Sequence, residues 1–311
     1  MIRSAVVGTG GWGKNHLRVL NEMNSLKAFV EIDSSKRKSY EKLYNVTGYE
    51  NIDLLLSNEE IDAVTVCTPT STHYDVAKKF LTHGIATLVE KPLTYKSSQG
   101  EELVNIAKDN NSILTVGFIE RFNPAIEGVK KVLKEKKLGD PLLLEFRREN
   151  RWAGVVRDVG VILDSSVHDI DTARWIFHDE PHIVFARKGT VITEHEDFAT
   201  IVLGFDQQRT AFLISNWVTP KKKRTISVTC TGGNVTADYL TQEVRIDDGN
   251  SITIPKRPFE EPLLKELTAF VTAVENKQQP LVTGLDGLNT TKIAEAALNS
   301  GERGIPIYLS L

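Results

Sequence analysis

The first 120 residues alternate short apolar runs with longer segments in which apolar residues recur every three or four positions. Runs of the first kind predict buried strands, and segments of the second kind predict amphipathic helices. Strands that alternate with helices of this length are typical of βαβ units, which build a parallel sheet with right-handed crossovers. The predicted strands are "IRSAVV", "KAFVEID", "IDAVTVCTPT", "IATLVE" and "SILTVGF", and the main predicted helices are "WGKNHLRVLNEMNSL", "HYDVAKKFLTHG" and "SSQGEELVNIAKDNN".

The pattern changes after about Arg121, where strand-like runs follow one another with short turns and mostly no helix between them. Such runs predict a large, mostly antiparallel sheet. We therefore predict an α/β chain with a doubly wound Rossmann domain at residues 1–120 and an α+β domain at residues 121–311. The predicted strands of the second domain are "PLLLEFRREN", "HIVFARKGTV", "FATIVLGFD", "RTAFLISNWV", "RTISVTCTGG" and "VRIDDGNSITI", and its helices are "ILDSSVHDIDTARWIF", "EPLLKELTAFVTAVEN" and "LNTTKIAEAAL".

Composition narrows the class of protein. The formal net charge is -3 over 311 residues, and this balance argues against a nucleic-acid-binding surface. For the basic run "KKKR" at residues 221–224, a solvated hairpin turn is favoured over a phosphate site. Cys67 and Cys230 lie in apolar segments without the spacing of a disulfide framework or a metal site, so we expect a reducing compartment and no metal. No apolar run approaches a secretory leader or membrane span, and a cytoplasmic location follows as the expectation.

A glycine-rich turn follows the first predicted strand. Gly8, Gly10 and Gly13 in "GTGGWG" match the G-x-G-x-x-G pattern, and Glu31 follows about 20 positions later at the end of the second strand. Strand, turn, helix and acidic residue together predict a dinucleotide site, with the pyrophosphate at the helix N-terminus and the ribose hydroxyls on Glu31. A carboxylate at Glu31 favours NAD, and NADP stays open because Lys36 is nearby.

Ligands of a doubly wound sheet bind outside the carboxyl ends of its strands. Two further groups of residues occupy such ends: Thr68 and Pro69 after the third strand, and "EKP" after the fourth. We expect a trans bond before Pro92, since most X–Pro bonds are trans. For His73, a structural role at the helix start is as well supported as a cofactor contact. The predicted cofactor contacts are Gly8, Gly10, Gly11, Trp12, Gly13, Glu31, Thr68, Pro69, His73, Glu90 and Lys91.

The segment "DSSVHDID" carries a second polar cluster. On an α-helix, Asp164, His168, Asp171 and Trp175 would share one stripe. A carboxylate and an imidazole one turn apart can form an acid–base pair in which the acid supports the protonated ring. A surface helix with a solvated polar face explains the segment equally well when it is read alone.

Taken together, these motifs resemble the glucose-fructose oxidoreductase / inositol dehydrogenase (Gfo/Idh/MocA) family. "VGTGGWG", "VCTPTSTHYDVA", "LVEKPLT", "VGFIERFNP" and "DSSVHDIDTARW" occur in that family's order. The resemblance implies oxidation of a secondary hydroxyl of a sugar or cyclitol, with the hydride passed to NAD or NADP. It also implies that Lys91, His168 and Asp164 are catalytic. Arg121 and Asn123 would contact the substrate, and the second-domain sheet would form a homodimer or homotetramer.

Within the family, "GFIERFNPAI" and "VGVILDSSVHDIDTARW" are most similar to dehydrogenases that act on UDP-N-acetylhexosamines, for example at the 3-position of UDP-N-acetylglucosamine. Arg148, Arg151 and Arg157 would supply the positive charge that a diphosphate favours. Three alternatives remain: an inositol or polyol dehydrogenase, a glycosidase that uses NAD without net redox change, and a non-catalytic NAD-binding regulator.

Overall fold

The computed structural model describes residues 2–154 and 158–310. The chain divides into two units, one made of Met1–Gly117 with Leu263–Leu288 and the other of Phe118–Pro262 with Asn289–Leu311. The division after Gly117 lies close to the boundary expected near residue 120. The segment Leu263–Leu288 differs, because it returns to the first unit although its sequence position suggested the second.

The first unit contains a six-stranded parallel sheet in the order β3-β2-β1-β4-β5-β6. The order reverses between β1 and β4, and in doubly wound sheets ligands bind at such a reversal. The predicted Rossmann topology is confirmed, with β3 as an additional short edge strand. The strands are β1 (Ser4–Val7), β2 (Leu26–Val30), β3 (Thr47–Tyr49), β4 (Ala63–Val66), β5 (Ala86–Val89) and β6 (Leu114–Val116).

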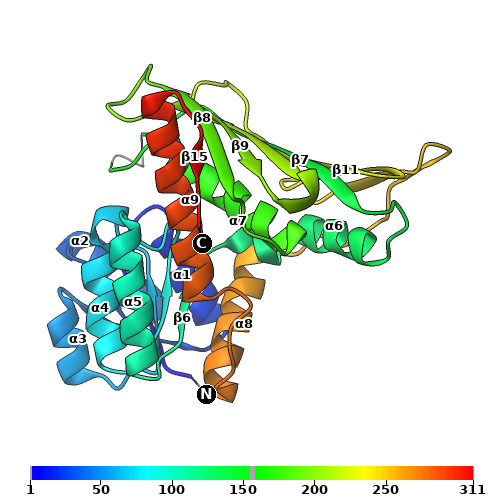
Figure 1. Cartoon of the computed structure of the whole chain (residues 1–311). Coiled ribbons are helices and arrows are strands. Elements are labelled where there is room, and N and C mark those ends of the chain that lie inside the picture. The colour runs from blue at the N-terminus through cyan, green and yellow to red at the C-terminus, as the bar shows by residue number, and fades with distance from the viewer. Residues whose placement is uncertain (1, 155–157, 311) are drawn as a thin grey trace. The chain divides into compact units, whose positions relative to one another are not determined.

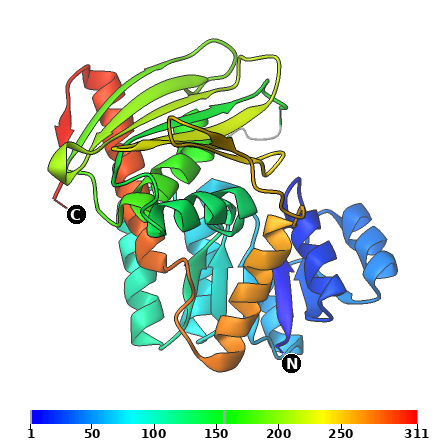
Figure 2. The same cartoon turned by 90° about the vertical axis from the view of Figure 1, so that its right-hand side faces the viewer.

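Helices cover both faces of this sheet, with α4 and α5 side by side on one face and α1 on the other (Figures 1 and 2). The helices shield both faces from solvent, and strands β1, β4 and β5 are buried along their whole length. The helices of this unit are α1 (Gly13–Glu22), α2 (Ser34–Tyr44), α3 (Ile52–Asn58), η1 (Thr70–Thr72), α4 (His73–Thr82), α5 (Ser97–Asp109) and most of α8 (Pro262–Asn276).

The second unit contains a nine-stranded sheet in the order β14-β13-β12-β11-β7-β10-β9-β8-β15. Its pairs are antiparallel except β7 with β10, which confirms the mostly antiparallel sheet. The strands are β7 (Pro141–Glu149), β8 (Ile183–Gly189), β9 (Phe198–Gly204), β10 (Thr210–Asn216), β11 (Lys223–Cys230), β12 (Gly233–Asp238), β13 (Val244–Asp247), β14 (Ile252–Thr253) and β15 (Ile307–Tyr308).

Two helices, α6 and α7, lie along one face of the nine-stranded sheet (Figure 1). Buried residues alternate with partly exposed ones along β9, β10 and β11, as expected for a sheet covered on one face. The helices of this unit are η2 (Ile119–Phe122), α6 (Pro124–Lys134), the π-helix η3 (Ile162–Ser166), α7 (Val167–Phe177), η4 (Asp206–Gln208) and the greater part of α9 (Gly284–Arg303).

The basic run at residues 221–224 does not form the predicted hairpin turn. Strand β7 lies between β10 and β11, so the connection that contains Lys221 and Lys222 passes the end of β7. Its last residue, Arg224, belongs to β11 and is only partly exposed, whereas the three lysines are exposed. Within the described part of the chain, no helix combines the length and apolar character of a membrane span.

Candidate active site

The glycine turn after β1 has the tight backbone that its three glycines predict. Gly8 has φ +85°, a left-handed conformation that favours glycine, and a Cβ on Gly13 would lie 2.0 Å from the Gly8 carbonyl oxygen. Gly10 differs, because a Cβ there would meet no atom within 4 Å. The outer glycines thus bring α1 against β1, and Gly10 leaves the backbone open to an approaching ligand.

Glu31 follows β2 and is buried beside this turn. Its Oε2 accepts hydrogen bonds from the Thr9 backbone N–H, at 3.1 Å, and from the Thr9 hydroxyl, while Oε1 accepts the Asp33 N–H at 2.9 Å. Burial by itself raises the pKa of Glu31, but these donors outweigh it and hold the pKa below its ordinary value. The group is therefore an anion with lone pairs left for ribose hydroxyls.

Glu90 joins three parts of the first unit. Its Oε1 accepts the Trp12 indole N–H at 2.8 Å and lies 2.9 Å from His16 Nε2, while Oε2 accepts the Lys91 backbone N–H at 3.2 Å. Burial opposes ionisation of Glu90, but the His16 contact and the Lys91 charge bring its pKa below the ordinary value. Glu90 thereby fixes the backbone from which the Lys91 side chain starts.

His16 was not among the predicted site residues. It is fully buried on the sheet-facing side of α1, together with Leu17 and Leu20. Its Nδ1 has no hydrogen-bond partner within residues 2–154 and 158–310, so the ring is held through Nε2, which lies against Glu90. The signal in the sequence was a histidine four positions before Leu20, on the apolar stripe of the predicted helix.

His73 links the loops that follow β4 and β5. Its Nδ1 lies 2.8 Å from the Pro92 carbonyl oxygen and its Nε2 lies 2.9 Å from the Thr68 carbonyl oxygen. Both ring nitrogens thus meet backbone carbonyls, which supports the structural alternative for this residue.

Lys91 is partly exposed at the carboxyl end of β5. The Lys91–Pro92 bond is cis, so the expectation of a trans bond was wrong.

In the second unit, the segment with the predicted acid–base pair is not one regular α-helix. A π-helix, Ile162–Ser166, precedes α7 and contains Asp164. His168 is the second residue of α7. The π-turn interrupts the continuous α-helix that the sequence predicted, and such turns are frequent at functional sites. Asp164 is half-buried and accepts the Ser165 hydroxyl at 2.9 Å, and His168 is buried.

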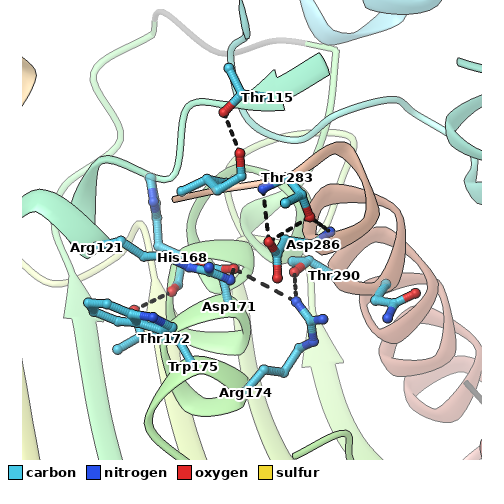
Figure 3. Close-up of polar contacts among 12 residues, drawn as sticks. Thr115, Arg121, His168, Asp171, Thr172, Arg174, Trp175, Thr283, Asp286 and Thr290 are labelled. Atoms are coloured by element: carbon cyan, nitrogen blue, oxygen red, sulfur yellow. Dashed lines mark hydrogen bonds and ion pairs between the residues drawn. The ribbon is translucent and has the colours of Figure 1, made fainter. Parts of the chain in front are cut away.

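Asp171 and Trp175, further along α7, hold Arg121 (Figure 3). Asp171 accepts two hydrogen bonds from the Arg121 guanidinium, at 2.8 and 2.6 Å, and the same guanidinium lies 5.6 Å from the centre of a Trp175 ring. Arg174 Nη1 is 3.8 Å from Asp171 and donates to the Thr290 hydroxyl at 3.1 Å. Arg121 was predicted to contact substrate; here it crosslinks η2 to α7.

Arg148 and Asn123 are also engaged within the protein. The Arg148 guanidinium is buried and donates to Asp169, at 2.9 Å, and to Glu120, at 3.0 Å. Asn123 Oδ1 caps α6 by accepting the Ala125 N–H, and its Nδ2 donates to Glu120 and to the Tyr239 carbonyl. Their predicted substrate contacts stay predictions, and each has a structural role here.

The other two arginines of the predicted diphosphate site are Arg151 and Arg157. Arg151 follows β7 and is exposed. Arg157 lies outside the described residues.

The described residues contain no group of three or more histidine, cysteine or acidic side chains that could hold a metal ion.

Comparison with protein families assigns both halves of this architecture. Residues 2–118 match the family described as "Oxidoreductase family, NAD-binding Rossmann fold" (GFO/IDH/MocA), and residues 126–236 match the GFO/IDH/MocA C-terminal domain. The chain belongs to the GFO/IDH/MocA oxidoreductase family. The predicted resemblance is thus confirmed, and with it the prediction of an NAD-dependent oxidoreductase.

Several members of this family are similar to the chain over most of its length. The UDP-N-acetylglucosamine 3-dehydrogenase of Acidithiobacillus ferrooxidans is 26% identical, over 83% of this chain and 80% of that protein. The inositol 2-dehydrogenase of Rhizobium meliloti is also 26% identical, over 96% of each. The solved structure of the A. ferrooxidans enzyme GnnA superposes with a TM-score of 0.90 at 24% identity, covering 97% of this chain and 98% of that one.

The residues of the GFO/IDH/MocA chain fit an NAD cofactor. Gly10 leaves open space in front of the glycine turn, α1 begins at Gly13, and the ionised Glu31 has the polarity that ribose hydroxyls require. These are features of the first unit alone. They identify which residues would hold the pyrophosphate and the adenosine ribose.

Proposed function

We propose that this GFO/IDH/MocA member oxidises a secondary hydroxyl of a sugar or nucleotide sugar, with the 3-position of UDP-N-acetylglucosamine as the first candidate. The observation that carries the proposal is the joint presence of Lys91 directly after β5, of Asp164 in the π-helix η3 and of His168 in the first turn of α7. Sugar and inositol dehydrogenases of the family are equally similar in sequence, so the substrate class rather than one sugar is supported.

The proposed chemistry divides the work between cofactor and protein. NAD, when bound, exchanges a hydride with carbon. His168 takes the hydroxyl proton as general base, and the negative charge of Asp164 favours the protonated imidazole that results. The Lys91 ammonium stabilises negative charge that develops on the same oxygen. Glu90 positions Lys91 by accepting its backbone N–H and is anchored in turn by Trp12.

The experiment follows nicotinamide absorbance with NAD or NADP and a panel of UDP-N-acetylglucosamine, free sugars and myo-inositol. Lys91→Ala and His168→Ala are each expected to lower kcat by about 100-fold or more. Lys108→Ala and His182→Ala are matched controls, because both residues are exposed and belong to the same two units. Both controls should keep wild-type rates.

Three outcomes would contradict the proposal. NAD binding without turnover of any substrate would favour a non-catalytic regulator. Cleavage of an aryl glycoside without accumulation of NADH would favour the redox-neutral glycosidase. Retention of full activity in both alanine variants would remove Lys91 and His168 from the mechanism. Turnover of myo-inositol alone would keep the dehydrogenase and replace the nucleotide sugar by a polyol.

We also propose that the chain forms a homodimer or homotetramer through the nine-stranded sheet. The face that α6 and α7 do not cover carries partly exposed apolar residues of adjacent strands, among them Phe185, Val202 and Phe212. Phe185 and Val202 are register partners, and so are Val202 and Phe212. Light scattering of the wild type and of Val202→Glu tests this, because a charge in the middle of such an interface should produce monomers.

A further inference from the structure

Two arginines face each other across neighbouring strands of the second unit. Arg148 of β7 and Arg224 of β11 are register partners, and both belong to the face of the sheet that α7 covers. Arg148 is fully buried, and the Arg224 side chain retains 31% of its exposure. Like charges directly opposite each other destabilise a sheet, so the pair needs negative charge nearby.

Nearby carboxylates neutralise the guanidinium charge of Arg148 more fully than that of Arg224. Arg148 has hydrogen bonds to both Asp169 and Glu120. Among the residues that the structure describes, Arg224 has one ion pair, and it is distant, 3.9 Å from Nη1 to the Glu120 oxygen that Arg148 already contacts. The buried Nε of Arg224 has no hydrogen-bond partner within the described parts of the chain. A guanidinium offers several N–H donors in a fixed planar fork, and here that fork is almost unused.

Lys222 adds a second cation to the same place. The pKa values of Lys222 and Arg224 are both lowered, first by partial loss of hydration, although the Lys222 side chain still reaches solvent, and then by neighbouring positive charge. For Lys222 this charge comes from Arg224 and Arg148, and for Arg224 it comes from Arg148. The neighbouring carboxylates, chiefly Glu120, do not compensate fully. An external anion would relieve both cations at once.

This cationic group lies beside the proposed acid–base pair. Asp164 is close enough to Arg224 to contribute to its electrostatic environment. Asp169, which follows His168 directly in α7, binds Arg148. The whole arrangement belongs to the second unit.

We propose that Arg224 and Lys222 form a subsite for a phosphoryl group of the substrate, so that the enzyme prefers a phosphorylated sugar, such as a nucleoside-diphosphate sugar, to an uncharged one. The inference rests on the proposed function and deepens it. Arginine matches phosphate oxygens in a bidentate manner, and lysine adds a compact charge. The basic run at residues 221–224 therefore contains a ligand-binding arginine at its end.

The test compares Arg224→Gln and Lys222→Gln with Lys221→Gln, which removes the same charge from a neighbouring exposed position. Calorimetry with UDP needs no turnover. Arg224→Gln should raise the Kd for UDP, and the KM for UDP-N-acetylglucosamine, by about tenfold or more, and Lys222→Gln by a smaller factor of about 2 to 5. The kcat at saturation, the Kd for NAD and all constants of Lys221→Gln should stay at wild-type values.

Failure of this inference is distinguishable from failure of the proposed function. Equal UDP affinity in the wild type and Arg224→Gln would overturn the subsite, whatever the enzyme oxidises. Turnover of myo-inositol or glucose without UDP binding would overturn it and leave the dehydrogenase intact. Loss of UDP binding in Arg224→Gln without turnover of any sugar would support the subsite and contradict the proposed reaction.

Two further measurements separate phosphoryl binding from other roles of Arg224. Tighter binding of glucuronate than of UDP, with the same dependence on Arg224, would assign the site to carboxylates and overturn the phosphoryl assignment. A purely structural arginine predicts a lower Tm in Arg224→Gln with unchanged UDP affinity. The subsite predicts the reverse, because removal of one of two facing cations relieves repulsion.

Discussion

Replacement of Arg148 by methionine tests whether this arginine supports the fold or binds substrate. Methionine keeps an unbranched apolar side chain but removes the guanidinium. Asp169 and Glu120, both buried, would then lose the cation to which they are hydrogen-bonded at 2.9 and 3.0 Å. Breaking a buried ion pair by removal of one partner costs about 3–5 kcal/mol, so we expect a loss of that size in the free energy of unfolding.

The loss should depend on pH. Burial already raises the pKa of Asp169, and Arg148 is the main group that lowers it. Without Arg148 the pKa of Asp169 in the folded state rises further above its unfolded value. Between those two values the native state binds more protons than the unfolded state, so stability falls as pH rises through the window. The destabilisation of Arg148→Met should therefore be smaller near pH 5 than near pH 7, because acid protonates the unpaired carboxylate.

Urea unfolding of the wild type and two variants measures both effects. A loss of this size shifts the midpoint by roughly 1 M or more. Arg147→Met is the matched control, because Arg147 is the preceding residue, faces the other way and has an exposed side chain that pairs with Glu149. Its change should stay under about 0.5 kcal/mol. Equal midpoints for the two variants would refute the reasoning, and wild-type stability with a raised KM would assign Arg148 to the substrate.

Two other predictions concern the cofactor half of the site. Glu31→Ala should raise the Kd for NAD by about tenfold or more and reduce the preference over NADP, as measured by fluorescence titration; unchanged selectivity would exclude Glu31 as the determinant. Gly13→Ala should lower the Tm and abolish NAD binding, because its Cβ would lie 2.0 Å from the Gly8 carbonyl. Gly10→Ala should fold normally, with nothing within 4 Å of its Cβ, and bind NAD more weakly; equal Tm losses in the two variants would contradict this.

The glycine turn and the parallel sheet of the first unit could be predicted from the sequence because their signals are local. Gly8 and Gly13 are required by backbone sterics within one strand–turn–helix unit, and Glu31 ends the next strand of the same unit. The alternation of strands and helices likewise predicted the parallel sheet. His16 and Glu90 were harder to pair, because their hydrogen bond joins residues 74 positions apart.

The helix that carries His168 shows where local periodicity fails. Its sequence predicts a continuous α-helix, but the first turn is a π-helix. One contact at that turn is the Ile162 N–H donated to Glu196 Oε1 at 3.1 Å, across 34 positions of sequence. No spacing rule within the segment contains that partner. The contact between Ile162 and Glu196 therefore lay beyond what the segment itself could predict, because only the fold brings Glu196 close.

The sequence by itself determined the family, the two fold types and the glycine turn after β1, because each depends on contiguous or regularly spaced positions. It did not determine which cations are available to a ligand. Arg121 and Arg148 are hydrogen-bonded to carboxylates of α7, whereas Arg224 has a distant ion pair with Glu120, which Arg148 also contacts. That difference follows from the register of β7 against β11 and the packing of α7 on the sheet, since charges pair through space and not along the chain.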